Sequence, residues 1–286
     1  ANGQCRLLLS ASASLPLIYF TSKNKPSPMT APNFCMLLRT HIGSARVSDI
    51  RQPGMERVVM FELEHLNELG DPCKKVLIME LMGKHSNIIF CDDKNMILDS
   101  IKHVSSHMSS VREVLPGREY FIPQTQDKLD PLTVSEELFR EVVCRKPCNI
   151  SKAIYSSLTG ISPVVAEEVC FRASVDGSEA AQALDETAQV HLYHTFCRLM
   201  DQVKEGDFSP NIVYRGEEPV EYGVFAFQQY GPEYHSVEFD SVSEMLETYY
   251  ATKNTLTRIH QKSSDLRRIV QTALERNRKK LTLQEK

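Results

Sequence analysis

Residues 74–98, KKVLIMELMGKHSNIIFCDDKNMIL, contain two apolar runs separated by a short polar segment. The runs cover residues 76–82 and 88–91, and the turn-forming sequence Asp-Asp-Lys-Asn follows the second one. Apolar runs of this length, bounded by turn residues, are typical of buried β-strands. We therefore expect residues 74–104 to form an antiparallel meander.

Strand patterns also precede the meander. Residues 57–63 have an alternating pattern with β-branched side chains, and residues 6–10 and 17–21 are shorter strand candidates around a polar turn. Residues 31–42 instead place apolar side chains at the 3.6-residue period of a helix. Residues 1–125 are thus predicted to form a mostly antiparallel β domain with one helix.

The pattern becomes helical over residues 126–205. Residues 134–144 are predicted as a helix that begins at Thr133, with Glu136 placed to complete a capping box. Residues 179–205 are predicted as a longer amphipathic helix.

Two short helices are predicted within this region, over residues 151–158 and 163–172. The turn between them, Thr159-Gly160-Ile161-Ser162, has the form of a helix-hairpin-helix, in which a glycine permits the tight turn and the second helix start can hold a phosphate. The alternative is a helix pair that serves only as a scaffold, because Glu167 and Glu168 disfavour a phosphate.

The C-terminal part combines strands with one long helix. Strand candidates at residues 212–214, 222–229 and 235–239 predict a small α/β element. Residues 242–286 form one helical pattern without Gly or Pro, and a seven-residue apolar recurrence at Ile259, Leu266 and Ala273 is typical of the start of a coiled coil. The predicted fold class is α+β, in four parts: residues 1–125, 126–205, 206–245 and 246–286.

Charge is unevenly distributed along the 286 residues, whose formal net charge is −4. Residues 251–286 hold ten Lys or Arg against three Asp or Glu, and residues 1–60 hold seven against two. Basic ends are compatible with contact to nucleic acid, because phosphate neutralisation supplies affinity that does not depend on sequence. The alternative is a basic helix that is merely solvated.

Cysteine usage and hydropathy indicate the compartment. The eight cysteines contain no C-x-x-C pair, so we expect reduced thiols and a cytoplasmic protein. The sequence contains no run of about 18 apolar residues, so no membrane-spanning helix is predicted. The first residues contain neither an initiator Met nor a signal region, and we expect the chain to be a piece of a longer protein.

Patterns typical of catalysis or metal binding do not occur. The nine histidines are scattered, and the sequence contains no Walker loop, no H-E-x-x-H and no G-x-S-x-G. We therefore expect a binding module rather than an enzyme, with no cofactor.

Two polar segments are candidates for nucleic-acid contact. In the first, Lys84, His85, Ser86 and Asn87 can present donors to a phosphate or a base edge, but composition alone favours a turn whose side chains bond the local backbone. In the second, the pair Glu56-Arg57 lies at a turn, and the alternative is a solvated surface pair.

Five stretches and one tyrosine together resemble one family. They are residues 34–41 (FCMLLRTH), 52–57 (QPGMER), 80–89 (ELMGKHSNII), 112–117 (REVLPG) with Tyr120, and 275–281 (ERNRKKL). In this order they are similar to the N-terminal region of the NFACT family, whose bacterial members include the RqcH and FbpA (fibronectin-binding-like) proteins.

The resemblance implies a fold and a function. It implies an N-terminal domain similar to that of formamidopyrimidine-DNA glycosylases, followed by helix-hairpin-helix elements and a coiled coil. It also implies a cytoplasmic, ribosome-associated quality-control factor that binds tRNA (alanine tRNA in bacteria) and the large ribosomal subunit with stalled peptidyl-tRNA, and that supports template-free C-terminal alanine tailing.

The resemblance further implies which residues bind nucleic acid. The family's Asp-Arg pair for tRNA recruitment aligns with Glu56-Arg57, where Glu56 is expected to orient the guanidinium of Arg57. The family's Met-Gly-Arg-His-Ser-Asn run aligns with residues 82–87, with Lys84 in place of Arg. The predicted binding residues are Glu56, Arg57, Lys84, His85, Ser86, Asn87, Gly160, Arg276, Arg278, Lys279 and Lys280.

Two other functions remain open at this point. One is an adhesin-like module that binds fibronectin at the cell surface, as the second family name suggests. The other is a glycosylase-like DNA-binding protein, as the implied fold suggests.

Overall fold

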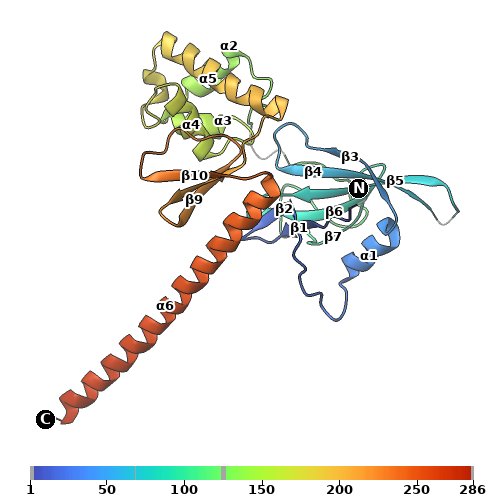
Figure 1. The fold of residues 1–286 in the computed structure, drawn as a ribbon. Helices are drawn as coiled ribbons and strands as arrows, with labels where there is room; N and C mark the ends of the chain where they lie inside the picture. Colours follow the sequence, from blue (N-terminus) through green and yellow to red (C-terminus); the bar gives the residue numbers. More distant parts are fainter. Residues whose placement is uncertain (1–2, 68, 124–126, 285–286) are drawn as a thin grey trace. The chain divides into compact units, whose positions relative to one another are not determined.

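The computed structural model describes residues 3–67, 69–123 and 127–284 and divides the chain into two compact units (Figure 1). The first unit comprises Ala1–Phe208 with Phe227–Gln229, and the second comprises Ser209–Ala226 with Tyr230–Lys286. Both contain antiparallel sheets and helices, so the predicted α+β class is confirmed. The two C-terminal parts expected as separate segments form one unit.

A five-stranded antiparallel sheet forms the core of the first unit, in the order β3-β4-β5-β6-β7. Its strands are β3 (Arg46–Arg51), β4 (Val58–Leu66), β5 (Pro72–Glu80), β6 (Asn87–Asp92) and β7 (Ile97–Ser100). Because each strand pairs with the next one in sequence, the predicted meander is confirmed.

Both faces of this sheet are covered, which explains the uninterrupted apolar runs of β5 and β6. One face buries Ile78 and Ile89 with Tyr120 from a later loop. The other buries Met79 and Phe90 beneath the hairpin of β1 (Leu7–Ala11) and β2 (Pro16–Phe20) and beneath α1 (Asn33–Ile42). Successive side chains of a strand point to opposite faces, so a strand covered on both sides is apolar at every position.

The helical part of the first unit contains α2 (Glu136–Phe139), a π-helical turn (Arg140–Cys144), α3 (Ile150–Ser157), α4 (Pro163–Arg172), a 3-10 turn (Ala181–Ala183) and α5 (Glu186–Glu205). Two predicted helix starts are wrong. Ser135, not Thr133, caps α2 by accepting from the backbone N of Leu138 at 3.3 Å. Asp185 caps α5 by accepting from the N of Ala188 at 2.7 Å, so this helix begins seven residues later than predicted.

The second unit packs a three-stranded antiparallel sheet against α6 (Val242–Gln284). The strand order is β10-β8-β9, with β8 (Asn211–Arg215), β9 (Glu218–Gly223) and β10 (Tyr234–Glu238). The strand predicted at 222–229 is wrong, because a tight turn at Gly216 (φ +61°) starts β9 directly after β8. Ile212, Met245 and Tyr249 form the shared core.

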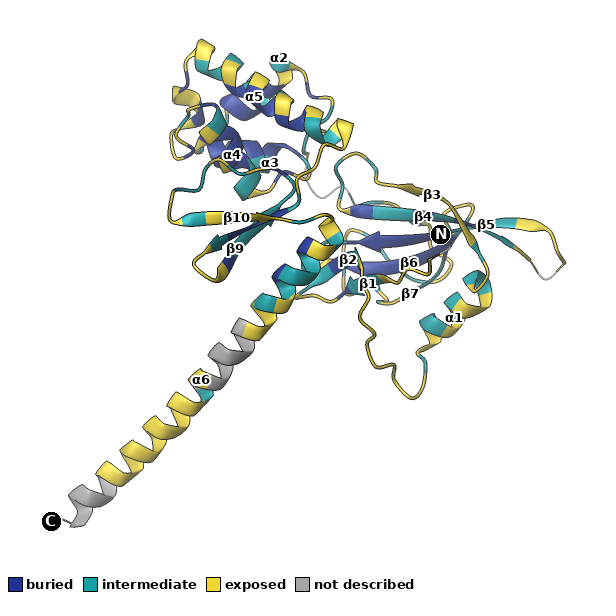
Figure 2. Ribbon diagram, in the orientation of Figure 1, coloured by how far each residue is buried: buried dark blue, intermediate teal, exposed yellow. Residues whose placement is uncertain are grey.

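Most of the described side chains of α6 after Thr252 are exposed (Figure 2). They include the apolar residues Leu266, Ile269, Val270 and Leu274 on one continuous helix. The side chains of residues 256–262, 264 and 279–284 lie outside the described part of the structure.

Candidate nucleic-acid interface

Three strand termini meet at one end of the five-stranded sheet, and they bring the two predicted polar segments together. Val58 at the start of β4 pairs with Glu80 at the end of β5, and Glu80 pairs with Asn87 at the start of β6. The backbone N of Leu81 donates to the carbonyl oxygen of Arg57 at 2.8 Å. Arg57 therefore adjoins the turn that carries Lys84 and His85.

Glu56 and Arg57 differ in their surroundings. Arg57 is exposed and Glu56 is half-buried, and no ion pair among the described residues joins them. Glu56 instead closes its own turn: its N donates to the carbonyl of Pro53 at 3.0 Å, and its carbonyl accepts from Nε2 of Gln52 at 2.8 Å. The expectation that the Glu56 carboxylate orients the guanidinium of Arg57 is therefore not met.

The segment at residues 82–87 separates into a surface part and a buried part. Lys84 and His85 are exposed on a 3-10 turn, Gly83–His85. Ser86 is buried, and its Oγ accepts from the N of Met82 at 2.9 Å. The exposed donors of this segment therefore come from Lys84 and His85.

Asn87 is also buried, with 2% of its surface exposed. Its Oδ1 accepts from the N of Ile88 and of Lys102, and its Nδ2 donates to the carbonyl of Lys102 at 2.8 Å. Every polar atom of the amide is thus bonded to backbone. The prediction that Ser86 and Asn87 present donors at the surface is wrong, because both side chains hold the loop ends together.

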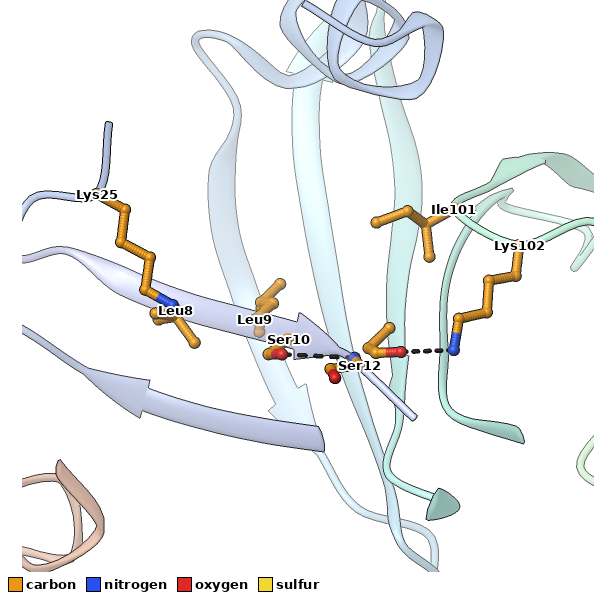
Figure 3. A pocket seen from close by; sticks show the side chains of 8 residues that line it. Leu8, Leu9, Ser10, Ser12, Lys25, Ile101 and Lys102 are labelled. Atoms are coloured by element: carbon orange, nitrogen blue, oxygen red, sulfur yellow. Dashed lines mark hydrogen bonds between the residues drawn. The ribbon is translucent and has the colours of Figure 1, made fainter. Parts of the chain in front are cut away.

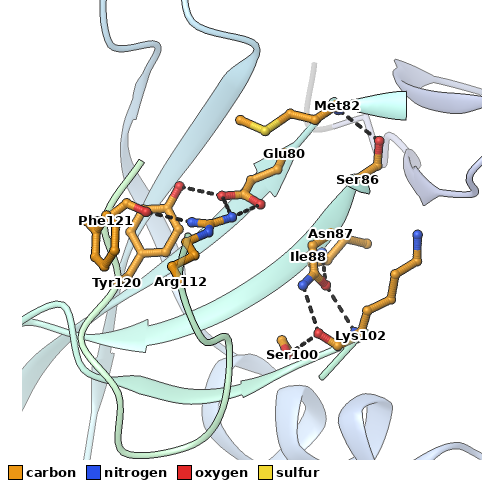
Figure 4. Close-up of polar contacts among 10 residues, drawn as sticks. All are labelled: Glu80, Met82, Ser86, Asn87, Ile88, Ser100, Lys102, Arg112, Tyr120 and Phe121. Carbon is orange, nitrogen blue, oxygen red and sulfur yellow. Dashed lines mark hydrogen bonds and ion pairs between the residues drawn. The ribbon is translucent and has the colours of Figure 1, made fainter. Parts of the chain in front are cut away.

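A buried ion pair supports this end of the sheet (Figure 4). Nη2 of Arg112 donates to both carboxylate oxygens of Glu80 at 2.6 Å, and the hydroxyl of Tyr120 donates to Glu80 Oε1 at 2.9 Å. Burial, followed by the charge of Glu80, raises the pKa of Tyr120. The network fixes the loop after β7 to the end of β5. All three residues lie in stretches that carry the family resemblance, Glu80 in residues 80–89 and Arg112 with Tyr120 in residues 112–120.

The helix-hairpin-helix turn contacts the loop that precedes Arg57. Gly160 has φ +75°, and a Cβ atom there would lie 2.5 Å from the carbonyl oxygen of Met55. Ser162 caps α4 by accepting from the N of Val165 at 3.2 Å. The structure thus brings Gly160 to the same region as Arg57.

Glu168, which counted against a phosphate at the hairpin, is fully buried. Its carboxylate accepts from Nε of Arg172 at 2.7 Å and from the backbone N atoms of Gln228 and Gln229. Its charge is therefore compensated inside the first unit.

Two lysines near the hairpin were missed by sequence reasoning. Nζ of Lys128 donates to the carbonyl of Tyr155 at 3.1 Å, and Nζ of Lys146 donates to Oγ of Ser157 at 2.9 Å. Burial lowers the pKa of Lys128, and the charges of Arg57 and Lys146 lower it further. Neither lysine belongs to a recognisable binding motif, so the sequence indicated neither one.

The remaining predicted residues lie in the second unit. Arg276 and Arg278 are exposed on α6. Lys279 and Lys280 continue the same helix, and their side chains lie outside the described residues.

An open pocket of about 430 Å³ lies beside β1 (Figure 3). It is lined by Leu8, Leu9, Ser10, Ala11, Ser12, Lys25, Ile101 and Lys102. The ammonium group of Lys102 donates to the carbonyl of Ala11. None of the predicted binding residues lines this pocket, although the backbone of Lys102 is hydrogen-bonded to the Asn87 amide.

Metal-ligating side chains do not cluster in the described part of the chain. Within residues 3–67, 69–123 and 127–284, no group of three or more His, Cys, Asp or Glu side chains is placed to hold a metal ion. No described helix has the length and apolarity needed to cross a bilayer. The eight cysteines, all of them described, are free.

The chain is similar to known proteins over its whole length. A family model described as NFACT N-terminal and middle domains matches residues 1–286. The chain is 34% identical over 282 residues to the Rqc2 homolog RqcH of Bacillus subtilis, a match that covers 98% of the chain and 47% of the relative. It is 31% identical over 281 residues to the Rqc2 homolog RqcH of Streptococcus suis, with 98% and 46% covered. The chain thus spans about half the length of these relatives.

Solved structures show the same fold. The N-terminal part of the fibronectin/fibrinogen-binding protein from Streptococcus suis has a TM-score of 0.70 and 28% identity, covering 88% of this chain and 85% of that one. The fibrinogen-binding protein from Staphylococcus aureus has a TM-score of 0.72 at 24% identity, covering 87% and 85%, and supports the fold alone.

Proposed function

The chain belongs to the NFACT family through its N-terminal and middle domains, and from this membership we propose that it binds tRNA and the large ribosomal subunit as part of a ribosome-associated quality-control factor. The observation that carries the proposal is the placement of exposed Arg57, Lys84 and His85 at one end of the sheet, in a chain homologous to RqcH.

The chemistry of these side chains suits RNA. A guanidinium can donate two parallel hydrogen bonds to a phosphate or a guanine edge, and an ammonium attracts phosphate as a point charge. No ion pair among the described residues uses Arg57 or Lys84. Their donors therefore remain open to a ligand, whereas Ser86 and Asn87 serve the fold.

The protein acts as a binding module in this proposal. Alanine tRNA is recruited to a large subunit that holds stalled peptidyl-tRNA, and the ribosome catalyses the addition of C-terminal alanine. No cofactor is required of this chain, and the site of action is cytoplasmic and ribosome-associated.

The direct test is tRNA binding by the full-length protein over a series of salt concentrations. The dissociation constant should rise steeply with KCl, since each neutralised phosphate contributes about 0.7–0.9 to the slope of log Kd against log salt. Sequencing of RNA crosslinked to the protein should return tRNA and ribosomal RNA. Binding to a DNA duplex that equals or exceeds tRNA binding would contradict the proposal.

Fibronectin binding is the second candidate, favoured by the names of solved relatives. If it is the function of this chain, immobilised fibronectin should capture the protein with an affinity that Arg57→Ala leaves unchanged. A glycosylase-like function predicts strand cleavage of a duplex that contains an abasic site, and the proposed function predicts none.

A further inference from the structure

The last turn of α3 holds two cationic side chains immediately before the hairpin. Lys128 donates to the carbonyl of Tyr155, and Lys146 donates to Oγ of Ser157. The C-terminal end of a helix is the negative end of its dipole and favours cations. Both lysines are half-buried, so their ammonium groups are positioned rather than freely solvated.

The loop before β4 reaches the same place from the sheet. Gly160 contacts Met55, and a Cβ atom at Gly54 would lie 3.5 Å from Oδ2 of Asp130. Burial lowers the pKa of Lys128, the charges of Arg57 and Lys146 lower it further, and the charge of Glu56 raises it. Three cations beside the one carboxylate of Glu56 leave a net positive charge at a partly buried place, which favours an anion there.

We propose that Lys128, Lys146 and Arg57 form a cationic cluster that holds backbone phosphate of the bound RNA beside the hairpin, an inference that rests on the proposed tRNA binding. An ammonium group has three N–H donors. One hydrogen bond to α3 leaves two donors on each lysine for phosphate oxygens. No ion pair within the described residues occupies any of the three side chains.

A salt series with matched variants tests the cluster. Lys128→Gln and Lys146→Gln should each reduce the slope of log Kd for tRNA against log[KCl] by about 0.7–0.9, and the double variant by about twice that amount. Lys152→Gln is the matched control, because it removes the same charge from an exposed position of α3. It should keep the wild-type slope.

The outcomes separate the two proposals. A double variant with the wild-type slope, in a protein that does bind tRNA, would overturn the cluster alone. Absence of tRNA binding by the wild-type protein would overturn the proposed function and the cluster with it.

A second measurement uses the unaltered protein and does not depend on the variants folding. Lysines are acetylated with and without tRNA, and tRNA should protect Lys128 and Lys146 several-fold more than Lys152. Millimolar inorganic phosphate is the comparison ligand. Protection by phosphate but not by tRNA would assign the cluster to a free anion. Protection by neither ligand would exclude a phosphate site. Either result would overturn the inference.

Discussion

A methyl group on the Cα of Gly160 would lie 2.5 Å from the carbonyl oxygen of Met55, so the hairpin and the loop before β4 meet backbone to backbone. Gly160 also has φ +75°, a conformation that L-residues other than glycine adopt only with strain. Two independent constraints therefore require glycine here. The contact joins a predicted phosphate-binding turn to the segment that ends in Arg57.

Gly160→Ala should destabilise the protein by more than the cost of its backbone conformation. Gly206 at the end of α5 is the matched control, since it has φ +68° and a Cβ atom there would meet no other atom within 4 Å. Gly206→Ala should lower the free energy of unfolding by about 1–2 kcal/mol, and Gly160→Ala by more. Urea unfolding measures both. Equal losses would show that the hairpin has room to move away from Met55.

Arg57→Ala should weaken tRNA binding by the full-length protein about tenfold or more while leaving the melting temperature almost unchanged. The reason is that Arg57 is exposed and forms no ion pair within the described residues. Arg46→Ala is the control, because Arg46 is an exposed arginine that pairs with Glu64, near the end of β4 away from Arg57. Wild-type tRNA affinity in Arg57→Ala, or unfolding of that variant, would contradict the assignment.

Asn87→Ala and Lys84→Ala should have opposite consequences. Loss of the Asn87 amide leaves the N of Ile88 and both backbone groups of Lys102 without their partner, so the free energy of unfolding should fall by about 2–3 kcal/mol. Lys84→Ala should change stability by at most about 0.5 kcal/mol and should weaken tRNA binding. Denaturation and tRNA titration of the two variants provide the check. A stable Asn87→Ala protein with reduced tRNA affinity would restore Asn87 as a contact residue.

The sequence predicted the sheet well because burial on both faces leaves a local signal. The runs at 76–82 and 88–91 are apolar at every position except Glu80, and Asp and Asn residues mark the turn after β6. Helix starts were harder to place, since Thr133 and Ser135 both suit a cap and only the fold selects Ser135.

The candidate site was predicted only where a motif is continuous in the chain. Arg57 and Lys84 lie in recognisable segments, and β4–β5 pairing brings them together. The Asn87 amide bonds the backbone of Lys102, which lies 15 residues further along the chain. The lysines at 128 and 146 approach Arg57 only through the packing of α3, which no local pattern records.

Cys144 should make the protein less stable at alkaline pH. Burial raises the pKa of its thiol to about 11 in the folded chain, against about 8.5 for an unfolded cysteine. Between these values the unfolded chain releases a proton that the folded chain keeps, so the free energy of unfolding falls as pH rises. From pH 8 to pH 10 this thiol should contribute a loss of roughly 1–2 kcal/mol. Urea unfolding of Cys144→Ala should show a smaller loss over the same interval, and an identical loss would contradict the prediction.

The exposed basic side chains of α6 are expected to contact ribosomal RNA. Residues 251–286 hold ten Lys or Arg, and Arg276 and Arg278 are exposed on the helix. Arg276→Glu combined with Arg278→Glu should lower affinity for the large subunit and flatten its salt dependence by the equivalent of about two phosphate contacts. Glutamate is a good helix former, so the circular dichroism of α6 should persist.

Affinity for free tRNA provides the internal control for this pair of substitutions, because the proposed tRNA contacts belong to the first unit and α6 to the second. If α6 is an arm for the ribosome, subunit binding should weaken while tRNA binding stays close to that of the wild type. Equal weakening of both would indicate a general effect of net charge. Unchanged subunit affinity with an unchanged salt slope would show that this part of α6 is a spacer, since two charge reversals at a phosphate contact cannot leave counterion release unaltered.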